Sequence, residues 1–247
     1  MSEHKIAIAF DLYGTLLATE SMATHLGKIC GDDKKAHEVA RVWRQYQLEY
    51  SWRINAMGIY RSFRDITEAA LQQAADEAKL TLRPEHIVEL MRDYDALNLF
   101  PEVQCALDAL EAVQDQVDCY IFSNGPSAMI HASVASSPTL GKYAKLFKGE
   151  ISVEEVQAFK PDGRVYDHLV RETGHEGREE EVWLVSANAW DVVGARARGL
   201  QAAFVDRKGG GWTDRLGDVI GGIKPSVIAS GVDRAVIEIM NHSGGHY

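Results

Sequence analysis

Short apolar runs, each five or six residues long, recur along the chain at 5–10, 117–122, 182–186 and 201–205. Runs of this length and composition are typical of strands buried on both faces, as in a parallel sheet covered by helices. Helical patterns lie between them, at 103–113, 163–173 and 192–198. Strands that alternate with helices form βαβ units, so the sequence predicts an α/β fold whose core is an open, Rossmann-like parallel sheet.

One long stretch interrupts this alternation. Residues 21–97 contain almost no strand-like run but several amphipathic helical patterns, including 36–52 and 59–79. We therefore predict a helical cap at 21–97, inserted into a catalytic core formed by 1–20 and 98–247. With 247 residues, the chain is long enough for a core of this kind and a smaller insertion. The tract 133–148 is rich in turn-forming residues and is predicted to be a loop.

Charge and composition exclude several classes of partner. The formal net charge of −10 argues against nucleic-acid binding, which needs clustered Lys and Arg. An anionic substrate would have to be attracted by a local basic site. We expect no signal peptide before the first strand, and no apolar run approaches the roughly 20 residues of a membrane span. We therefore expect a cytoplasmic protein without a membrane partner.

Cysteines and histidines provide no site of their own. The odd count of three cysteines, without a CxxC pair, fits a reduced compartment. Cys105 and Cys119 lie in apolar patterns and are expected to pack in the core. No histidine belongs to a Cys/His cluster at zinc spacing, and His168 and His175 are expected at the surface. Neither GxGxxG nor a P-loop occurs, so we expect no metal and no nucleotide cofactor.

Polar residues follow the predicted strands at the points where these end. Asp11-Leu-Tyr-Gly-Thr15 follows the first run and Ser123-Asn124 the second, and Ser186-Ala-Asn188-Ala-Trp-Asp191 follows the third. Lys160-Pro161 lies in a loop between the second and the third of these motifs. Each motif alone could be a turn or a helix cap. Ligands of open α/β sheets bind beyond the carboxyl ends of the strands, so together these groups predict one site.

These motifs resemble the four signature motifs of the haloacid dehalogenase superfamily, whose members share an α/β core and an inserted cap. Two segments resemble the type II (L-2-)haloacid dehalogenases in particular: 43–50, Trp-Arg-Gln-Tyr-Gln-Leu-Glu-Tyr, and 186–196, Ser-Ala-Asn-Ala-Trp-Asp-Val-Val-Gly-Ala-Arg. The resemblance extends from the first strand to the last helix.

Two positions separate this chain from the magnesium-dependent phosphatases of the superfamily. Tyr13 stands where the phosphatases have a second Asp, which protonates the leaving oxygen. Ala187 stands where they have a metal-binding acid. Mg²⁺ prefers several oxygen ligands, and only Asp11 and Asp191 remain as candidate carboxylates. A halide leaves without protonation, so both losses suit a dehalogenase.

The resemblance implies a mechanism. Asp11 would attack C2 of a short 2-haloalkanoic acid, and water would hydrolyse the resulting ester to a 2-hydroxy acid of inverted configuration. Lys160 would lie beside Asp11 and keep it ionised. Asp191 would orient Lys160 and help to activate the water. Arg44 would receive the halide, a role that suits a permanently charged guanidinium, with help from Asn124.

The resemblance also implies roles for other residues. Ser123 would hold the substrate carboxylate, Thr15 and Ser186 would fix Asp11, and Asn188 would contact the ester or the water. Tyr166 would bond to the site or only pack against its helix. The wall around the alkyl group would comprise Leu12, Tyr13, Gln45, Leu48, Phe63 and Trp190. For Leu48 and Phe63, simple core packing is an equal alternative, because both lie on apolar helical faces.

Alternatives remain open at this point. The same fold and nucleophile could act on another carbon electrophile, such as fluoroacetate or a metabolite ester or lactone. A magnesium-dependent phosphatase is less well supported. A non-catalytic scaffold would not need Asp11, Arg44, Lys160, Asn188 and Asp191 together. The resemblance also implies a possible homodimer, with a small haloacid as the binding partner.

Overall fold

A six-stranded parallel sheet forms the centre of the molecule. The computed structural model describes residues 5–244. The strands lie in the order β3-β2-β1-β4-β5-β6, and every neighbouring pair is parallel. Their bounds are β1 Ile6–Phe10, β2 Val117–Ser123, β3 Phe147–Ser152, β4 Val182–Ser186, β5 Gln201–Val205 and β6 Val227–Ala229. The predicted Rossmann-like α/β fold is confirmed.

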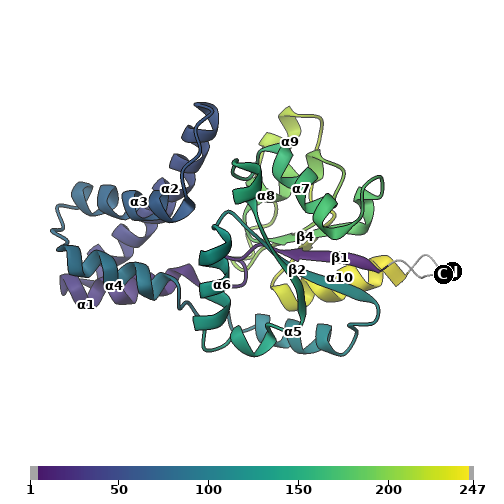
Figure 1. The fold of residues 1–247 in the computed structure, drawn as a ribbon, viewed down its shortest axis with the longest axis horizontal. Coiled ribbons are helices and arrows are strands. Elements are labelled where there is room, and N and C mark those ends of the chain that lie inside the picture. Colours follow the sequence, from purple (N-terminus) through teal and green to yellow (C-terminus); the bar gives the residue numbers. More distant parts are fainter. Residues whose placement is uncertain (1–4, 245–247) are drawn as a thin grey trace.

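Helices cover both faces of the sheet. Figure 1 shows α5 (Val103–Glu111) and α10 (Val232–Gly244) on one face, with α7 (Gly163–Thr173) and α8 (Ala189–Ala197) on the other. Two further helices are α6 (Ser127–Ser136) and the short α9 (Leu216–Val219). Both faces of β1 and β4 are therefore shielded from water, which explains why these strands are continuous apolar runs.

Two strands, β3 and β6, were not predicted. The prediction placed a loop over 133–148 and no strand near 227. Helix α6 continues to Ser136, and β3 begins at Phe147. β3 is an edge strand, and Lys148 and Glu150 on it are exposed. An edge strand with one solvated side does not need a continuous apolar run, which is why the pattern was not visible in the sequence.

Four helices between β1 and α5 form a separate group at one end of the sheet (Figure 1). Their bounds are α1 Met22–Cys30, α2 Asp33–Ala56, α3 Phe63–Glu77 and α4 Pro84–Tyr94. The chain leaves and returns side by side, because Ala18 N–H donates to Asn98 O at 2.9 Å and Phe100 N–H donates to Leu16 O at 3.0 Å. We refer to the segment from Met22 to Tyr94 as the cap segment.

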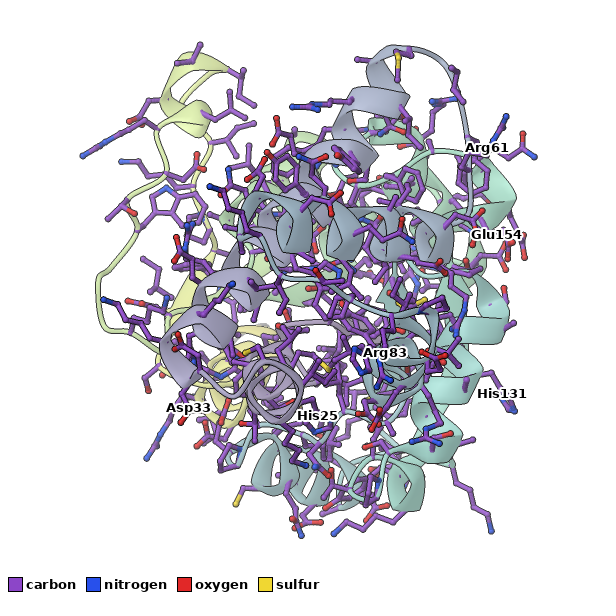
Figure 2. All side chains as sticks on the ribbon, turned by 90° about the vertical axis from the view of Figure 1, so that its left-hand side faces the viewer. His25, Asp33, Arg61, Arg83, His131 and Glu154 are labelled. Atoms are coloured by element: carbon purple, nitrogen blue, oxygen red, sulfur yellow. The ribbon has the colours of Figure 1, made fainter. Side chains whose placement is uncertain are left out.

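The longest helix of this segment, α2, has a clear start. The Asp32 side chain accepts a hydrogen bond from Lys35 N–H at 3.0 Å, which satisfies one of the free amides of the first turn. Figure 2 views the molecule from the side of the cap segment, and the labelled Asp33, Arg61 and Arg83 are exposed charged residues of that region. None of the helices within 5–244 is long and apolar enough to cross a membrane.

The two cysteines expected in the core differ in their surroundings. Cys119, on β2, is buried as predicted. Cys105 is exposed, so that prediction was wrong. The buried residues of α5 are Val103, Ala106, Leu107 and Leu110, which follow a helical stripe that position 105 does not share.

Candidate active site

The polar residues at the strand ends converge at one edge of the sheet. Asp11 directly follows β1, Asn124 follows β2, and Asn188 lies two residues after β4. Asp11 is fixed through its backbone, because its N–H donates to Val185 O of the neighbouring strand at 3.0 Å. Lys160 reaches the same edge from the loop before α7.

Asp11 is 6% exposed, and its two carboxylate oxygens have different surroundings. Oδ2 accepts hydrogen bonds from Thr15 Oγ1 and Asn188 Nδ2, both at 2.8 Å, and from Ser186 Oγ at 3.4 Å. Oδ1 accepts one bond, from Lys160 Nζ at 3.2 Å. These donors stabilise the ionised carboxylate and fix its orientation.

Lys160 is fully buried between two carboxylates. Its ammonium also donates to Asp191 Oδ2 at 3.0 Å and to Phe122 O at 2.9 Å. Its backbone N–H donates to Asn124 Oδ1 at 2.9 Å. A buried charge is tolerated only when it is paired and hydrogen-bonded, and here all three protons of the ammonium have acceptors.

Asp191 completes this network from α8. Burial raises the pKa of its carboxyl, the neighbouring Lys160 ammonium opposes the rise, and the charge of Asp11 adds to it. Tyr166 Oη donates to Asp191 Oδ1 at 2.7 Å. Burial raises the pKa of Tyr166 well above its usual range, so the hydroxyl remains a donor.

A small cavity of about 10 Å³ lies above Asp11. A cavity needs about 10–15 Å³ to hold one water molecule, so this space is nearly closed. Its lining combines polar groups with apolar and aromatic walls: Asp11, Tyr13, Arg44, Leu48, Phe63, Ser123, Asn124 and Trp190. A space this small excludes a large ligand.

Arg44 carries positive charge into this cavity from the cap segment. Its guanidinium donates to Gln47 Oε1 at 2.5 Å and to Tyr13 O at 3.2 Å. Gln47 is 1% exposed and in turn donates to Thr67 Oγ1 at 2.7 Å. The sequence reasoning missed Gln47, although its spacing of three residues from Arg44 on a helix was a usable signal.

Two residues predicted for the wall do not reach the cavity. Gln45 is exposed and accepts a hydrogen bond from Arg41 at 3.4 Å. Leu12 is fully buried in the hydrophobic core. Neither side chain lines the cavity as the structure has it. Adjacent helical residues point in different directions, so Gln45 cannot share the face of Arg44, whereas Leu48, four residues on, does.

Two wall residues are held by aromatic neighbours. The Tyr13 hydroxyl lies 2.8 Å from Ser133 Oγ, and its ring centroid lies 5.1 Å from that of Tyr94. Burial raises the pKa of Tyr13 far above its usual range, so it is a neutral wall residue. The Trp190 ring packs edge-on against Trp52 at 5.6 Å.

Arg207 supports the loop that carries the nucleophile, a role that no pattern in the sequence indicated. Its guanidinium donates to Thr15 O at 2.7 Å and to Gly14 O at 3.3 Å. It also donates to Glu102 Oε1 at 2.7 Å and lies 3.7 Å above the ring of Phe100. These contacts fix the turn from which Thr15 reaches Asp11.

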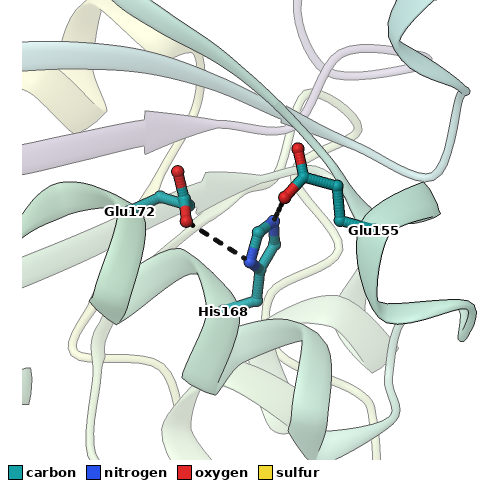
Figure 3. A group of neighbouring side chains, drawn as sticks. All are labelled: Glu155, His168 and Glu172. Carbon is teal, nitrogen blue, oxygen red and sulfur yellow. Dashed lines mark ion pairs between the residues drawn. The ribbon is translucent and has the colours of Figure 1, made fainter.

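A second group of potential metal ligands lies on the outside of α7. Figure 3 shows Glu155 and Glu172 facing opposite edges of the His168 ring, at 4.0 Å from Nε2 and 3.8 Å from Nδ1. Arg171 donates to Nδ1 at 2.8 Å, so this nitrogen already has a partner. The arrangement is a charge network that connects α7 with the preceding 3₁₀ turn.

The predicted surface position of His168 and His175 was wrong. They are 1% and 5% exposed, respectively. His168 lies beneath the charged side chains around it, and His175 Nε2 lies 3.1 Å from Lys5 O. Both therefore have structural roles away from the cavity above Asp11.

The family model of the haloacid dehalogenase-like hydrolases matches residues 7–199, and the chain belongs to this family. It is 36% identical over 206 residues to haloacetate dehalogenase H-2 of a Moraxella species, covering 82% of this chain and 86% of that protein. It is 33% identical over 228 residues to (S)-2-haloacid dehalogenase 2 of a Pseudomonas species, covering 92% of each. The L-2-haloacid dehalogenase structure from Xanthobacter autotrophicus superimposes with a TM-score of 0.82 at 26% identity, covering 96% of this chain and 99% of that one.

Proposed function

We propose that this chain hydrolyses short 2-haloalkanoic acids to halide and 2-hydroxy acids, with inversion at C2. The observation that carries the proposal is the Asp11 carboxylate at a small cavity, paired with buried Lys160 and facing a wall that includes Arg44. A carboxylate in this setting is a nucleophile with a cationic partner. The likeness to relatives named as haloacetate and (S)-2-haloacid dehalogenases supports the same reaction.

In the first step, Asp11 Oδ1 acts as the nucleophile. Oδ1 accepts a single hydrogen bond, from Lys160, whereas Oδ2 accepts three. Fewer donors leave its lone pairs more available for attack. Oδ1 attacks C2 from the side opposite the halogen, the O–C bond forms as the carbon–halogen bond breaks, and the bonding pair leaves with the halide. This geometry inverts C2.

The halide leaves toward Arg44 and Asn124. The Asn124 carbonyl oxygen is held by Lys160 N–H, and within residues 5–244 the Nδ2 group has no partner. It is therefore free to donate to an anion in the cavity, beside the guanidinium of Arg44. Ser123 lines the same cavity and receives the substrate carboxylate.

In the second step, water attacks Cγ of the Asp11 ester. The bond between Cγ and the alkoxyl oxygen breaks, the 2-hydroxy acid leaves, and the carboxylate re-forms. Asp191 receives one proton from water, because burial raises the pKa of its carboxyl, and passes it to the departing alkoxyl oxygen; the other proton of water leaves to solvent as the carboxylate re-forms. Lys160 lies between Asp11 and Asp191 and holds them in register throughout. Asn188 and Thr15 hold the other oxygen of Asp11.

Chloride release from each enantiomer of 2-chloropropionate tests this function, with EDTA-treated protein and an Asp11→Asn control. We expect release from the (S) enantiomer only, and none from the variant. Absence of release from both enantiomers and from bromoacetate would overturn the proposal. Ester, lactone and fluoroacetate substrates would then be tested with the same variant, since they need the same nucleophile.

A magnesium-dependent phosphatase fits the side chains poorly. A Mg²⁺ ion would have to take its carboxylate ligands from Asp11 and Asp191, because Ala187 offers none. Both oxygens of Asp191 are already hydrogen-bonded, to Tyr166 and Lys160. Phosphate release from p-nitrophenyl phosphate that requires Mg²⁺ would nevertheless replace the dehalogenase proposal with this one.

We also propose that 21–97 acts as a cap over the core, that the protein works in the cytoplasm, and that it forms a homodimer. All three cysteines within the described chain are free thiols, which suits a reducing compartment. Light scattering after size exclusion tests the dimer: we expect about 55 kDa, twice the 27.4 kDa of one chain. A mass of one chain at micromolar concentration would contradict it.

A further inference from the structure

Asn55, in the last turn of α2, contacts the backbone of Phe159, the residue immediately before Lys160. Its Nδ2 donates to Phe159 O at 2.7 Å, and its Oδ1 accepts from Phe159 N–H at 3.0 Å. One amide side chain thus satisfies both backbone groups of a residue 104 positions away in the sequence. This contact joins the cap segment to the core directly beside the catalytic lysine.

The contact is specific, because the Phe159 N–H donates to no other group in the described part of the chain. The carbonyl has a second partner, Asp162 N–H at 2.9 Å. Phe159 is fully buried, so loss of Asn55 would leave its N–H without an acceptor. The backbone would then have to move to regain one.

The ring of Phe159 is held by the same part of the cap segment. It stacks on Tyr60, with ring centroids 5.2 Å apart, and lies 5.8 Å from Phe63. Phe63 also lines the cavity above Asp11. Residues 55–63 therefore contact both the substrate cavity and the backbone that carries Lys160.

Lys160 has little freedom to absorb a shift of this backbone. Its ammonium holds Asp11 at 3.2 Å and Asp191 at 3.0 Å, and its own N–H is fixed by Asn124. A displacement of about 1 Å in a catalytic group can reduce a rate by about a hundredfold.

We propose that Asn55 is a positioning residue: by bonding to both backbone groups of Phe159, it keeps the Lys160 ammonium against Asp11 while the cap segment rests on the core. This inference rests on the proposed function of Asp11. It assigns to the cap segment a part in assembling the nucleophile, in addition to lining the cavity. Asn55 itself does not line the cavity above Asp11.

The test compares Asn55→Ala and Asn55→Asp with the matched control Gln72→Ala. Gln72 is an exposed amide on α3 that bonds only to Glu68, at 3.3 Å. Alanine suits the interior of a helix, so Asn55→Ala keeps α2 intact. In Asn55→Asp, one carboxylate oxygen would face Phe159 O, which is repulsive, so this variant keeps only half of the contact.

We expect Asn55→Ala to lower kcat roughly ten- to hundredfold with KM changed less than about twofold. Asn55→Asp should show the same split between kcat and KM, because it keeps only half of the contact with Phe159. The variants change none of the groups that face Asp11, which are Lys160, Asp191, Tyr94, Tyr166 and Arg44.

Two results would overturn the inference. One is an unchanged kcat in both Asn55 variants relative to Gln72→Ala. The other is a KM that rises as much as kcat falls, which would mean a merely structural contact. If the wild-type protein releases no halide at all, the proposed function fails, but the Asn55 contact can still be tested by NMR from the backbone amide resonances of Phe159 and Lys160. A Lys160 resonance that is equal in wild type and Asn55→Ala would then refute it.

Discussion

Replacing Tyr166 by Phe removes one oxygen from the buried network behind Asp11. The hydroxyl donates to Asp191 Oδ1 at 2.7 Å, in a fully buried position. Hydrogen bonds to charged groups contribute about 1.5–3 kcal/mol net. A central loss of about 2 kcal/mol in a chain of this size lowers Tm by roughly 4–8 °C. We therefore expect Tyr166→Phe to be clearly destabilised.

Tyr60→Phe is a matched control with the opposite expectation. Within residues 5–244 the Tyr60 hydroxyl is buried and has no hydrogen-bond partner. Burial of such a group costs free energy, so its removal should leave stability unchanged or raise it by up to about 1 kcal/mol. The same atom is deleted in both variants, and only the partner differs.

The loss in Tyr166→Phe should depend on pH. Burial raises the pKa of Asp191 in the folded protein above its value in the unfolded chain. Between these two pKa values the native protein binds more protons than the unfolded chain, so its stability falls as pH rises. Loss of the Tyr166 donor raises this pKa further. The difference in unfolding free energy between wild type and Tyr166→Phe should therefore grow as pH rises through the raised pKa of Asp191.

Urea unfolding followed by tryptophan fluorescence provides the measurement, because the chain has five tryptophans. A Tyr166→Phe variant within about 0.5 kcal/mol of wild type at pH 8 would refute the account, since ordinary surface changes have effects of that size. A Tyr60→Phe variant as unstable as Tyr166→Phe would refute it too.

Three further predictions concern other parts of the molecule. Arg44→Lys should lower kcat/KM for halide release roughly ten- to hundredfold, because one ammonium nitrogen replaces a planar fork whose Nη1 and Nη2 reach Gln47 and Tyr13 separately, and unchanged kinetics would contradict its role. Gly194→Ala would place a Cβ 2.5 Å from Tyr166 Oη and should cost about 1–3 kcal/mol in urea unfolding, so an unaltered midpoint would count against this packing. Burial raises the pKa of the Cys119 thiol to about 12. Cys119→Ser should therefore leave the number of thiols titrated at pH 8 unchanged in the folded protein and reduce it by one in urea. A lower number of titrated thiols in the folded variant would disprove the burial of Cys119.

Most of the sheet and the position of the site could be predicted from the sequence, because their signals lie in short, continuous segments. Buried parallel strands are continuous apolar runs, and the residues that follow them, Asp11, Asn124 and Asn188, meet at one edge by topology alone. The structure brings all three to that edge. β3 was missed because an edge strand with exposed Lys148 and Glu150 lacks that pattern.

The helical periodicity of α2 predicts which of its residues lie on the same face as Arg44. Arg44, Gln47 and Leu48 share one face of α2, and Gln45 does not. Reading the segment 43–50 by resemblance favoured Gln45, whereas the spacing favours Gln47. For helix α2, the rotation of about 100° per residue was a better guide than adjacency.

Contacts between distant loops were beyond prediction from one sequence. Asn55 and Phe159 are 104 residues apart, and Arg207 reaches Thr15 across 192 residues. Neither pair has a local signal, because an exposed-looking polar side chain finds its partner only when the chain is folded. The buried His168 is a similar case, since its neighbours come partly from a different turn.

The central claim is that Asp11 forms an ester with the substrate and that water cleaves this ester at the carboxyl carbon. A single turnover in H₂¹⁸O, with protein in excess over (S)-2-chloropropionate, tests it most directly by mass spectrometry of the peptide that contains Asp11. We predict that one ¹⁸O atom enters this peptide and that the 2-hydroxy acid from the first turnover contains none. ¹⁸O in the product, with an unlabelled Asp11 peptide, would contradict the account, because water would then have attacked the substrate directly.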